Sequence, residues 1–155
     1  MLSFSQINLH KASQATVLAG QSLERSNQSI ILMTEPYTHD NKITGLPRGT
    51  KLVFARTKDP AKSPRAGIAA GPGVNLTAME SWCNRDCAVA LARIGGVRTV
   101  LISLYLDIKL EIQPEWLDRL MGMLEATGYP VLMGIDSNAH STLYGPKKQW
   151  EGQCL

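Results

Sequence analysis

Two carboxylates stand where apolar, strand-like runs of this chain end. Glu35 follows the apolar run 30–34, and Asp136 follows the apolar run 131–135. A buried strand that stops at a carboxylate is a common way to place a hard-cation site on a rigid scaffold. The pair therefore indicates a divalent-cation site and an enzyme that uses it.

Asn138 extends the second of these strand ends. At a spacing of two residues in an extended chain, Asp136 and Asn138 point to the same side. The carboxylate can bind a metal or orient a water, and the amide can donate to a phosphate oxygen. Asp, Ser and Asn are also the usual residues of a turn after a strand. The spacing alone leaves the catalytic and the turn interpretations open.

Two further polar side chains, Asn8 and Tyr105, stand near the ends of other strand-like runs. Each is ambiguous by itself, since a strand-end amide is often solvated and a tyrosine often packs. Taken with Glu35 and Asp136, they make four separate strands that each end in a group suited to metal and phosphate chemistry.

The elements that must position these groups alternate between strand and helix patterns. The periodicity predicts strands at 4–9, 29–34, 51–56, 67–70, 87–94, 97–106 and 129–135, helices at 12–26 and 114–127, and a polar loop at 38–49. Gly95 and Gly96 predict a tight hairpin, and Pro36 biases Glu35 towards extended backbone. Hairpins mixed with strand–helix–strand units indicate an α+β domain with helices outside a mixed sheet.

Composition limits the class of protein. At 155 residues, 44% hydrophobic and 19% charged, the chain is one globular domain or part of one. It has neither an apolar run of about 18 residues, which a membrane span needs, nor a secretory signal pattern at its start, so we expect no membrane partner. Three cysteines are an odd number for a disulfide framework and favour an intracellular, reduced compartment.

Residues 42–65 carry seven basic side chains against one acid, Asp59. Such a run is often only a solvated surface, where lysine and arginine also discourage edge pairing of strands. The alternative is a surface that contacts the phosphate backbone of DNA. The candidate DNA contacts are Arg48, Lys51, Arg56 and Arg65.

Four residue strings resemble one known superfamily in their order and context. They are Gln6-Ile7-Asn8, Thr34-Glu35-Pro36, Ser103-Leu104-Tyr105 and Gly134-Ile135-Asp136-Ser137-Asn138-Ala139-His140-Ser141. The chain resembles the endonuclease/exonuclease/phosphatase superfamily, and within it the apurinic-like endonuclease domain of non-LTR retrotransposon reverse transcriptase polyproteins. The most specific string is the one from Asp136 to Ser141. The resemblance covers nearly all of the chain but only the N-terminal part of the family's domain.

The resemblance implies a four-layer α/β/β/α sandwich, incomplete here, with residues 1–155 forming one such domain that lacks its C-terminal part. It implies Mg²⁺, with Mn²⁺ as an alternative, bound by Glu35 and supported by Asn8. In the family pattern Tyr105 hydrogen-bonds the scissile phosphate, Asp136 orients the attacking water and Asn138 contacts the phosphate.

His140 belongs to the same motif, where the resemblance implies a packing role or a DNA-facing loop position. The family completes its site with a later Asp and a Ser-Asp-His string, and nothing of that kind follows Ser141. We therefore expect a Mg²⁺-dependent DNA endonuclease, of the kind that nicks one strand in the nucleus for retrotransposition, in a truncated and inactive form.

Two alternatives to the endonuclease remain. The first is a non-catalytic nucleic-acid- or protein-binding module derived from such a domain, whose open sheet edge would pair with the missing C-terminal part or with another chain. The second is a phosphoesterase that acts on lipids or inositol phosphates, and the Asn138-Ala139-His140 string argues against it.

Overall fold

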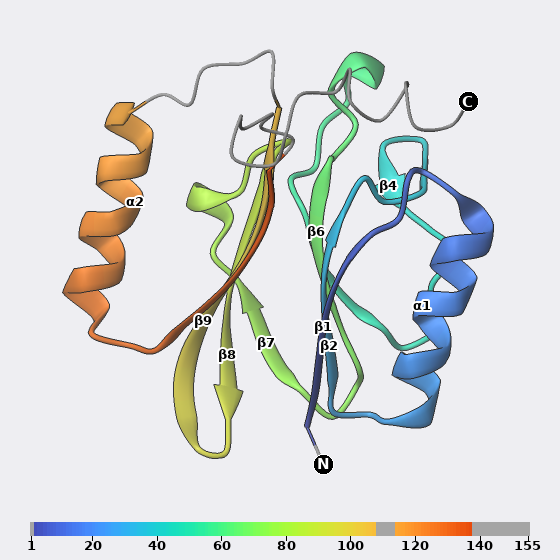
Figure 1. Ribbon diagram of the computed structural model, residues 1–155, viewed down its shortest axis with the longest axis horizontal. Coiled ribbons are helices and arrows are strands. Elements are labelled where there is room, and N and C mark those ends of the chain that lie inside the picture. Colours follow the sequence, from blue (N-terminus) through green and yellow to red (C-terminus); the bar gives the residue numbers. More distant parts are fainter. Residues whose placement is uncertain (1, 108–113, 138–155) are drawn as a thin grey trace, which may run out of the picture.

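Two four-stranded sheets pack face to face in the computed structural model, which describes residues 2–107 and 114–137 (Figure 1). The first sheet has the order β1 (Ser3–Asn8), β2 (Ser29–Thr34), β6 (Ala66–Ala70) and β5 (Lys51–Val53). The second has the order β10 (Val131–Ser137), β9 (Val97–Leu106), β8 (Cys87–Ile94) and β7 (Asn75–Ala78). Because each sheet mixes parallel and antiparallel neighbours, the predicted α+β class is confirmed.

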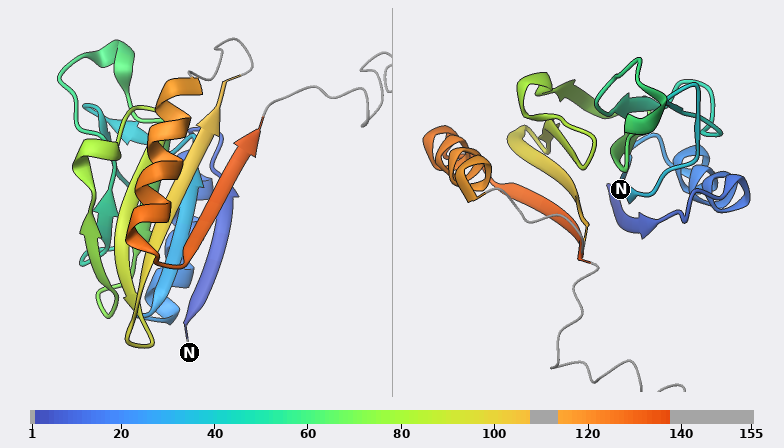
Figure 2. Two further views of the ribbon diagram at one scale, coloured as in Figure 1. Left: turned by 90° about the vertical axis from the view of Figure 1, so that its left-hand side faces the viewer. Right: turned by 90° about the horizontal axis from the view of Figure 1, so that it is seen from above.

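One helix covers the outer face of each sheet. Helix α1 (Ser13–Arg25) lies on the β1-β2-β6-β5 sheet and helix α2 (Pro114–Thr127) on the other, and the two views of Figure 2 show them on opposite sides of the molecule. The layers therefore run helix, sheet, sheet, helix. This is the predicted α/β/β/α sandwich.

Strand β2 explains why an unbroken apolar run belongs at the centre of the fold. All six of its residues are buried. Successive side chains of a strand point to opposite faces, so Ile30 and Leu32 pack between the two sheets while Ile31 and Met33 pack in the cluster under α1. A strand covered on both sides needs apolar side chains on both of its faces, which a strict alternation of apolar and polar residues would not supply.

Parallel pairing brings the functional strand ends together. Strand β1 pairs in parallel with β2, so that Asn8 lies opposite Thr34, and β10 pairs in parallel with β9, so that Asp136 lies opposite Tyr105. Strands β2 and β10 belong to the two facing sheets and contact each other. The carboxyl ends of four strands from two sheets therefore meet at one end of the sandwich, the upper end in Figure 1.

A buried hydrogen bond joins the two sheets just below this end. The hydroxyl of Ser103 on β9, 1% exposed, donates to the backbone oxygen of Met33 on β2 across 2.8 Å. Replacing Ser103 by alanine removes this bond between the sheets, while the Met33 carbonyl stays within the ladder that β2 forms with β6. We expect the free energy of unfolding to fall by about 1 kcal/mol in urea denaturation. The exposed Ser5→Ala variant on β1 is the control and should stay within about 0.5 kcal/mol of the parent.

The helices and strands expected from the sequence are present, with three differences. The expected polar loop at 38–49 contains a small hairpin of β3 (Thr38–His39) and β4 (Lys42–Ile43). Asp40 and Asn41 form its turn with φ of 48° and 58°, the positive values of a type I′ turn, which these two residue types tolerate. Strand β7 was not expected, and the strand expected at 51–56 ends at Val53.

Three-residue 3₁₀ turns, η1 (Pro60–Lys62) and η2 (Glu80–Trp82), lie in the connections. In the part of the chain that the structure describes, no helix is both long enough and apolar enough to cross a membrane.

Candidate functional site

One amide group links the two carboxylates, Glu35 and Asp136, that follow apolar runs of the sequence. The side-chain nitrogen of Asn8 donates to Oε2 of Glu35 at 2.8 Å and to Oδ2 of Asp136 at 2.6 Å. The backbone N–H of His10 donates to Oδ1 of Asn8 at 2.8 Å. Because a backbone N–H can only donate, the atom it meets must be the amide oxygen. This contact fixes the amide with its nitrogen towards the carboxylates.

Thr34, the last residue of β2, contributes a second donor. Its hydroxyl lies 2.9 Å from Oδ2 of Asp136, and the residue is 2% exposed. Asp136 therefore receives hydrogen bonds from Asn8 and Thr34 on a single oxygen, which holds its side chain in one orientation. No feature of the sequence beyond its place before Glu35 marked Thr34 as part of the site.

Glu35 has an unusual backbone conformation. Its φ is 46°, in the left-handed region that side chains other than glycine rarely adopt. The extended backbone expected from the following proline is therefore wrong. Two backbone hydrogen bonds hold the turn, from the Glu35 N–H to the carbonyl of Arg65 and from the Lys11 N–H to the carbonyl of Glu35, each 2.8 Å. A strained residue at a cluster of polar groups is typical of functional sites.

The carboxylates of Glu35 and Asp136 fit a hard divalent cation. Both accept from the same nitrogen, and among the described residues no lysine or arginine forms an ion pair with either. The nearest basic group is the imidazole of His10, with Nδ1 3.9 Å from Oε2 of Glu35 and the side chain 80% exposed. No cluster of three or more His, Cys, Asp or Glu side chains occurs in residues 2–107 and 114–137. Mg²⁺ needs only one or two carboxylates, because waters and substrate phosphate complete its shell.

Asn8 was predicted both to act in catalysis and to support the metal. With its nitrogen facing the carboxylates and its oxygen facing His10, the amide positions Glu35 and Asp136. Direct ligation of a metal by Asn8 stays a prediction.

Tyr105 lies on β9 beside the carboxylates, opposite Asp136 in the strand register. Burial raises the pKa of its phenol, the negative charge of Glu35 raises it further, and the positive charge of Arg65 opposes the change. The phenol therefore keeps its proton at neutral pH and remains a hydrogen-bond donor, as a contact to a phosphate oxygen requires.

Arg65 forms an ion-pair network next to Tyr105. Its guanidinium donates to both carboxylate oxygens of Asp86, at 2.5 and 2.8 Å, and to Oδ2 of Asp107 at 2.6 Å. Its central carbon lies 4.8 Å from the centre of the Tyr105 ring. The hydrogen bond to Asp86 is the largest contribution that raises the pKa of Arg65 above its ordinary value. No pattern in the sequence predicted this network.

The other predicted DNA contacts differ from Arg65 in exposure. Arg48, Lys51 and Arg56 are exposed, whereas the side chain of Arg65 is 11% exposed. The contacts of Arg65 favour a structural role, and its contact with DNA stays a prediction. Asn138 and His140 lie outside the described residues.

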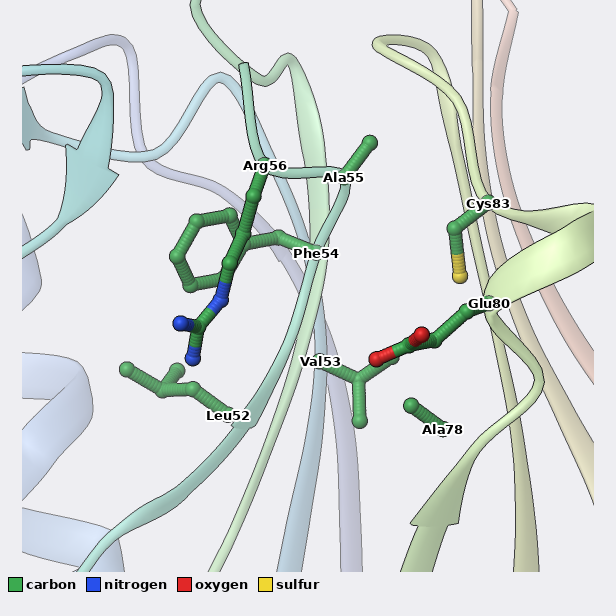
Figure 3. A pocket seen from close by; sticks show the side chains of 8 residues that line it. All are labelled: Leu52, Val53, Phe54, Ala55, Arg56, Ala78, Glu80 and Cys83. Atoms are coloured by element: carbon green, nitrogen blue, oxygen red, sulfur yellow. The ribbon is translucent and has the colours of Figure 1, made fainter. Parts of the chain in front are cut away.

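A separate hollow of about 320 Å³ lies between the end of β5 and the turn η2 (Figure 3). Its lining includes Phe54, Arg56, Glu80 and Cys83, with the arginine and the glutamate on opposite walls. None of the four strand-end residues lines it. With one cation and one carboxylate, it offers no concentrated positive charge to a phosphate backbone.

Comparison with known sequences gives one clear similarity. The chain matches no protein-family model. It is 27% identical over 159 residues to a Drosophila melanogaster protein described as the putative 115 kDa protein in type-1 retrotransposable element R1DM. The match covers 99% of this chain and 15% of that protein.

Comparison with solved structures agrees with this. The endonuclease domain of TRAS1, a telomere-specific non-LTR retrotransposon, superposes with a TM-score of 0.68 at 22% identity. The superposition covers 95% of this chain and 66% of that one. The chain therefore has the fold of that endonuclease domain. The resemblance to the endonuclease domain of a non-LTR retrotransposon, expected from the motifs, is confirmed.

Proposed function

We propose that this chain provides the metal-binding and phosphate-contacting part of a divalent-metal-dependent DNA endonuclease, of the kind that nicks target DNA for a retrotransposon. The observation that carries the proposal is the Asn8 amide, which joins Glu35 and Asp136 where the two sheets meet. Such an enzyme would act on DNA in the nucleus. The likeness to a retrotransposon endonuclease domain supports this substrate.

Each group has a role that its contacts support. Mg²⁺, or Mn²⁺ in its place, would be held at Glu35 with Asp136 beside it, and would supply charge neutralisation at the phosphate. Asp136, fixed by Asn8 and Thr34, would orient a water through its remaining lone pairs. The protonated phenol of Tyr105 would donate to a phosphate oxygen. Asn138, two residues beyond Asp136, is proposed to contact the same phosphate.

The described residues contain no histidine that a carboxylate orients firmly. The imidazole of His10 is 80% exposed and 3.9 Å from Glu35, and the imidazole of His39 is 75% exposed beside the exposed Asp40. Losing a positioned base usually lowers a rate by orders of magnitude. We therefore propose that this chain alone binds metal and DNA but cleaves DNA slowly or not at all.

A supercoiled-plasmid nicking assay with Mg²⁺ or Mn²⁺, run beside a Mn²⁺ titration, tests both parts of the proposal. The expected result is saturable Mn²⁺ binding with no more nicking than the Glu35→Ala variant shows. Robust nicking that disappears in that variant would support the metal site and overturn the inactivity. Absence of Mn²⁺ binding by the folded parent chain would overturn the proposed site itself.

A non-catalytic nucleic-acid- or protein-binding module is the second candidate. It is favoured by the exposed Arg48, Lys51 and Arg56, which form no ion pair with an acid in the described residues. Replacing all three by alanine should flatten the slope of log affinity against log salt by about 0.9 for each phosphate that these side chains neutralise in the parent. Filter binding of a DNA duplex at several salt concentrations measures this slope. An unchanged slope would mean that these residues do not contact phosphates.

A further inference from the structure

We propose that Arg65 is a positioning residue, which fixes both Tyr105 and Glu35 for their contacts with phosphate and metal. The inference rests on the proposed function and adds a residue to it. Arg65 was expected to contact DNA, as part of the basic segment 42–65. Its guanidinium instead pairs with Asp86 and Asp107 of the same chain.

The guanidinium is held on two sides. Nε and Nη2 form a bidentate pair with Asp86, and Nη1 donates to Asp107. The side chains of Arg65, Asp86 and Asp107 are only 11%, 26% and 20% exposed. Bidentate pairing fixes the plane of a guanidinium as well as its position. These bonds use three of the five N–H donors, and with the side chain 11% exposed little of the guanidinium is open to a DNA phosphate.

This fixed plane supports Tyr105 in two ways. The guanidinium carbon lies 4.8 Å from the centre of the Tyr105 ring, within the range of a cation–π contact. The backbone N–H of Tyr105 donates to the carbonyl of Asp86 at 2.8 Å, so the arginine's partner also holds the tyrosine's backbone. The direction of the phenol towards the carboxylates therefore depends on Arg65 and Asp86 together.

The backbone of Arg65 supports Glu35. Its carbonyl accepts the N–H of Glu35 at 2.8 Å, and its own N–H donates to the carbonyl of Arg85 at 2.7 Å. The Glu35 contact is one of the two that hold the left-handed turn at φ 46°. One residue thus connects the proposed metal ligand, through its backbone, with the proposed phosphate donor, through its side chain.

A double-mutant cycle tests the role of the guanidinium. The affinity of a DNA duplex is measured with and without Mg²⁺ for the parent, Arg65→Lys, Tyr105→Phe and the double variant. Lysine keeps the charge but cannot form the bidentate fork. We expect each single variant to lose Mg²⁺-dependent affinity by up to about tenfold, the order of one hydrogen bond to a charged group. The double variant should lose no more than either single variant, because both changes remove the same interaction with phosphate.

The salt dependence separates positioning from direct DNA contact. If Arg65 contacts a DNA phosphate directly, Arg65→Lys should keep nearly the DNA affinity of the parent. Any small loss of affinity in Arg65→Lys should then add to the loss that Tyr105→Phe causes. A direct phosphate contact would also make the slope of log affinity against log salt in Arg65→Met smaller by about 0.9. Either result overturns the inference. The exposed Arg48→Met is the matched control, which should change the slope and add to Tyr105→Phe.

Two further measurements keep the outcome clear. Where Arg65→Lys does not fold, as judged by circular dichroism, Asp107→Asn takes its place, since it removes one carboxylate and leaves the Asp86 pair intact. The loss of DNA affinity in Asp107→Asn should again be non-additive with that of Tyr105→Phe, and additivity would count against the inference.

The Mn²⁺ titration of the parent separates the two proposals. A parent chain that does not bind Mn²⁺ would overturn the proposed function. A parent that binds Mn²⁺, with losses of DNA affinity that add between the Arg65 and Tyr105 variants, would overturn the positioning role alone.

Discussion

Replacing Arg65 by methionine is expected to lower the free energy of unfolding by about 3 kcal/mol. The change removes the bidentate cation partner of Asp86 and one partner of Asp107 in a poorly solvated place, and breaking a buried ion pair from one side costs about 3–5 kcal/mol. The lower end applies because these side chains keep 26% and 20% of their surface exposed. Urea denaturation followed by circular dichroism measures the change, and the m-value should stay constant if only stability is altered.

Two variants show whether unpaired charge is the cause. The triple variant Arg65→Met, Asp86→Asn, Asp107→Asn removes all three charges and should recover most of the loss, because apolar or neutral groups replace an ion pair at little cost. Arg56→Met, at an exposed arginine 5.9 Å from the Phe54 ring, should change stability by no more than about 0.5 kcal/mol. A triple variant as unstable as Arg65→Met would mean that the arginine stabilises the fold by packing over Tyr105 rather than by its charge.

The site's carboxylates were predictable because each ends an apolar run. Four consecutive apolar residues, Ile30 to Met33, come before Thr34 and Glu35, which indicates a strand buried on both faces, and an apolar run also comes before Asp136. Strand ends of parallel neighbours meet at one edge, so Asn8 and Glu35 could be expected to approach. The contact from Asn8 to Asp136 joins two different sheets and was not predicted, although the resemblance to a known family placed both residues in one site.

The Arg65 network could not be predicted from local patterns. Asp86 comes just before β8, Asp107 just after β9, and Arg65 just before β6. These three residues come together because β6 of one sheet packs on β8 and β9 of the other. The hydrophobic periodicity of the sequence does not predict how two sheets pack. Within the basic run 42–65, Arg65 looks like its exposed neighbours. Its one local distinction is that the buried strand β6 follows it directly.

The turn at Glu35 shows the opposite case, where a local rule was available and gave the wrong answer. A residue before proline prefers extended backbone because of a steric clash with the proline ring. Here the hydrogen bonds from the Glu35 N–H to Arg65 and from Lys11 to the Glu35 carbonyl override that preference. His10 and Lys11 share the positive φ, at 51° and 57°. At this end of the sandwich, residues with left-handed backbone therefore follow both β1, at His10 and Lys11, and β2, at Glu35.

Replacing Glu35 by glutamine is expected to have opposite effects on metal affinity and on the stability of the metal-free protein. Glutamine keeps the shape of the side chain and can still accept from Asn8, but it removes the negative charge that a hard cation requires. Mn²⁺ affinity, measured by electron paramagnetic resonance or calorimetry, should fall at least about tenfold, since even substitutions of groups that only orient ligands cost about 10–100-fold.

Without metal, the same variant should be slightly more stable than the parent. Glu35 and Asp136 both accept from the nitrogen of Asn8, so two like charges lie side by side, and such a pair is destabilising by up to about 1 kcal/mol. Removing one charge should raise Tm by about 2–4 °C at this chain length. At the same concentration, added Mn²⁺ should raise Tm less in the variant than in the parent, because a ligand stabilises the folded state by an amount that grows with its affinity. Glu24→Gln, at an exposed position on α1, is the control and should shift neither quantity. A parent whose Tm ignores Mn²⁺, or a Glu35→Gln variant less stable than the parent without metal, would show that the two carboxylates serve the fold instead of a cation.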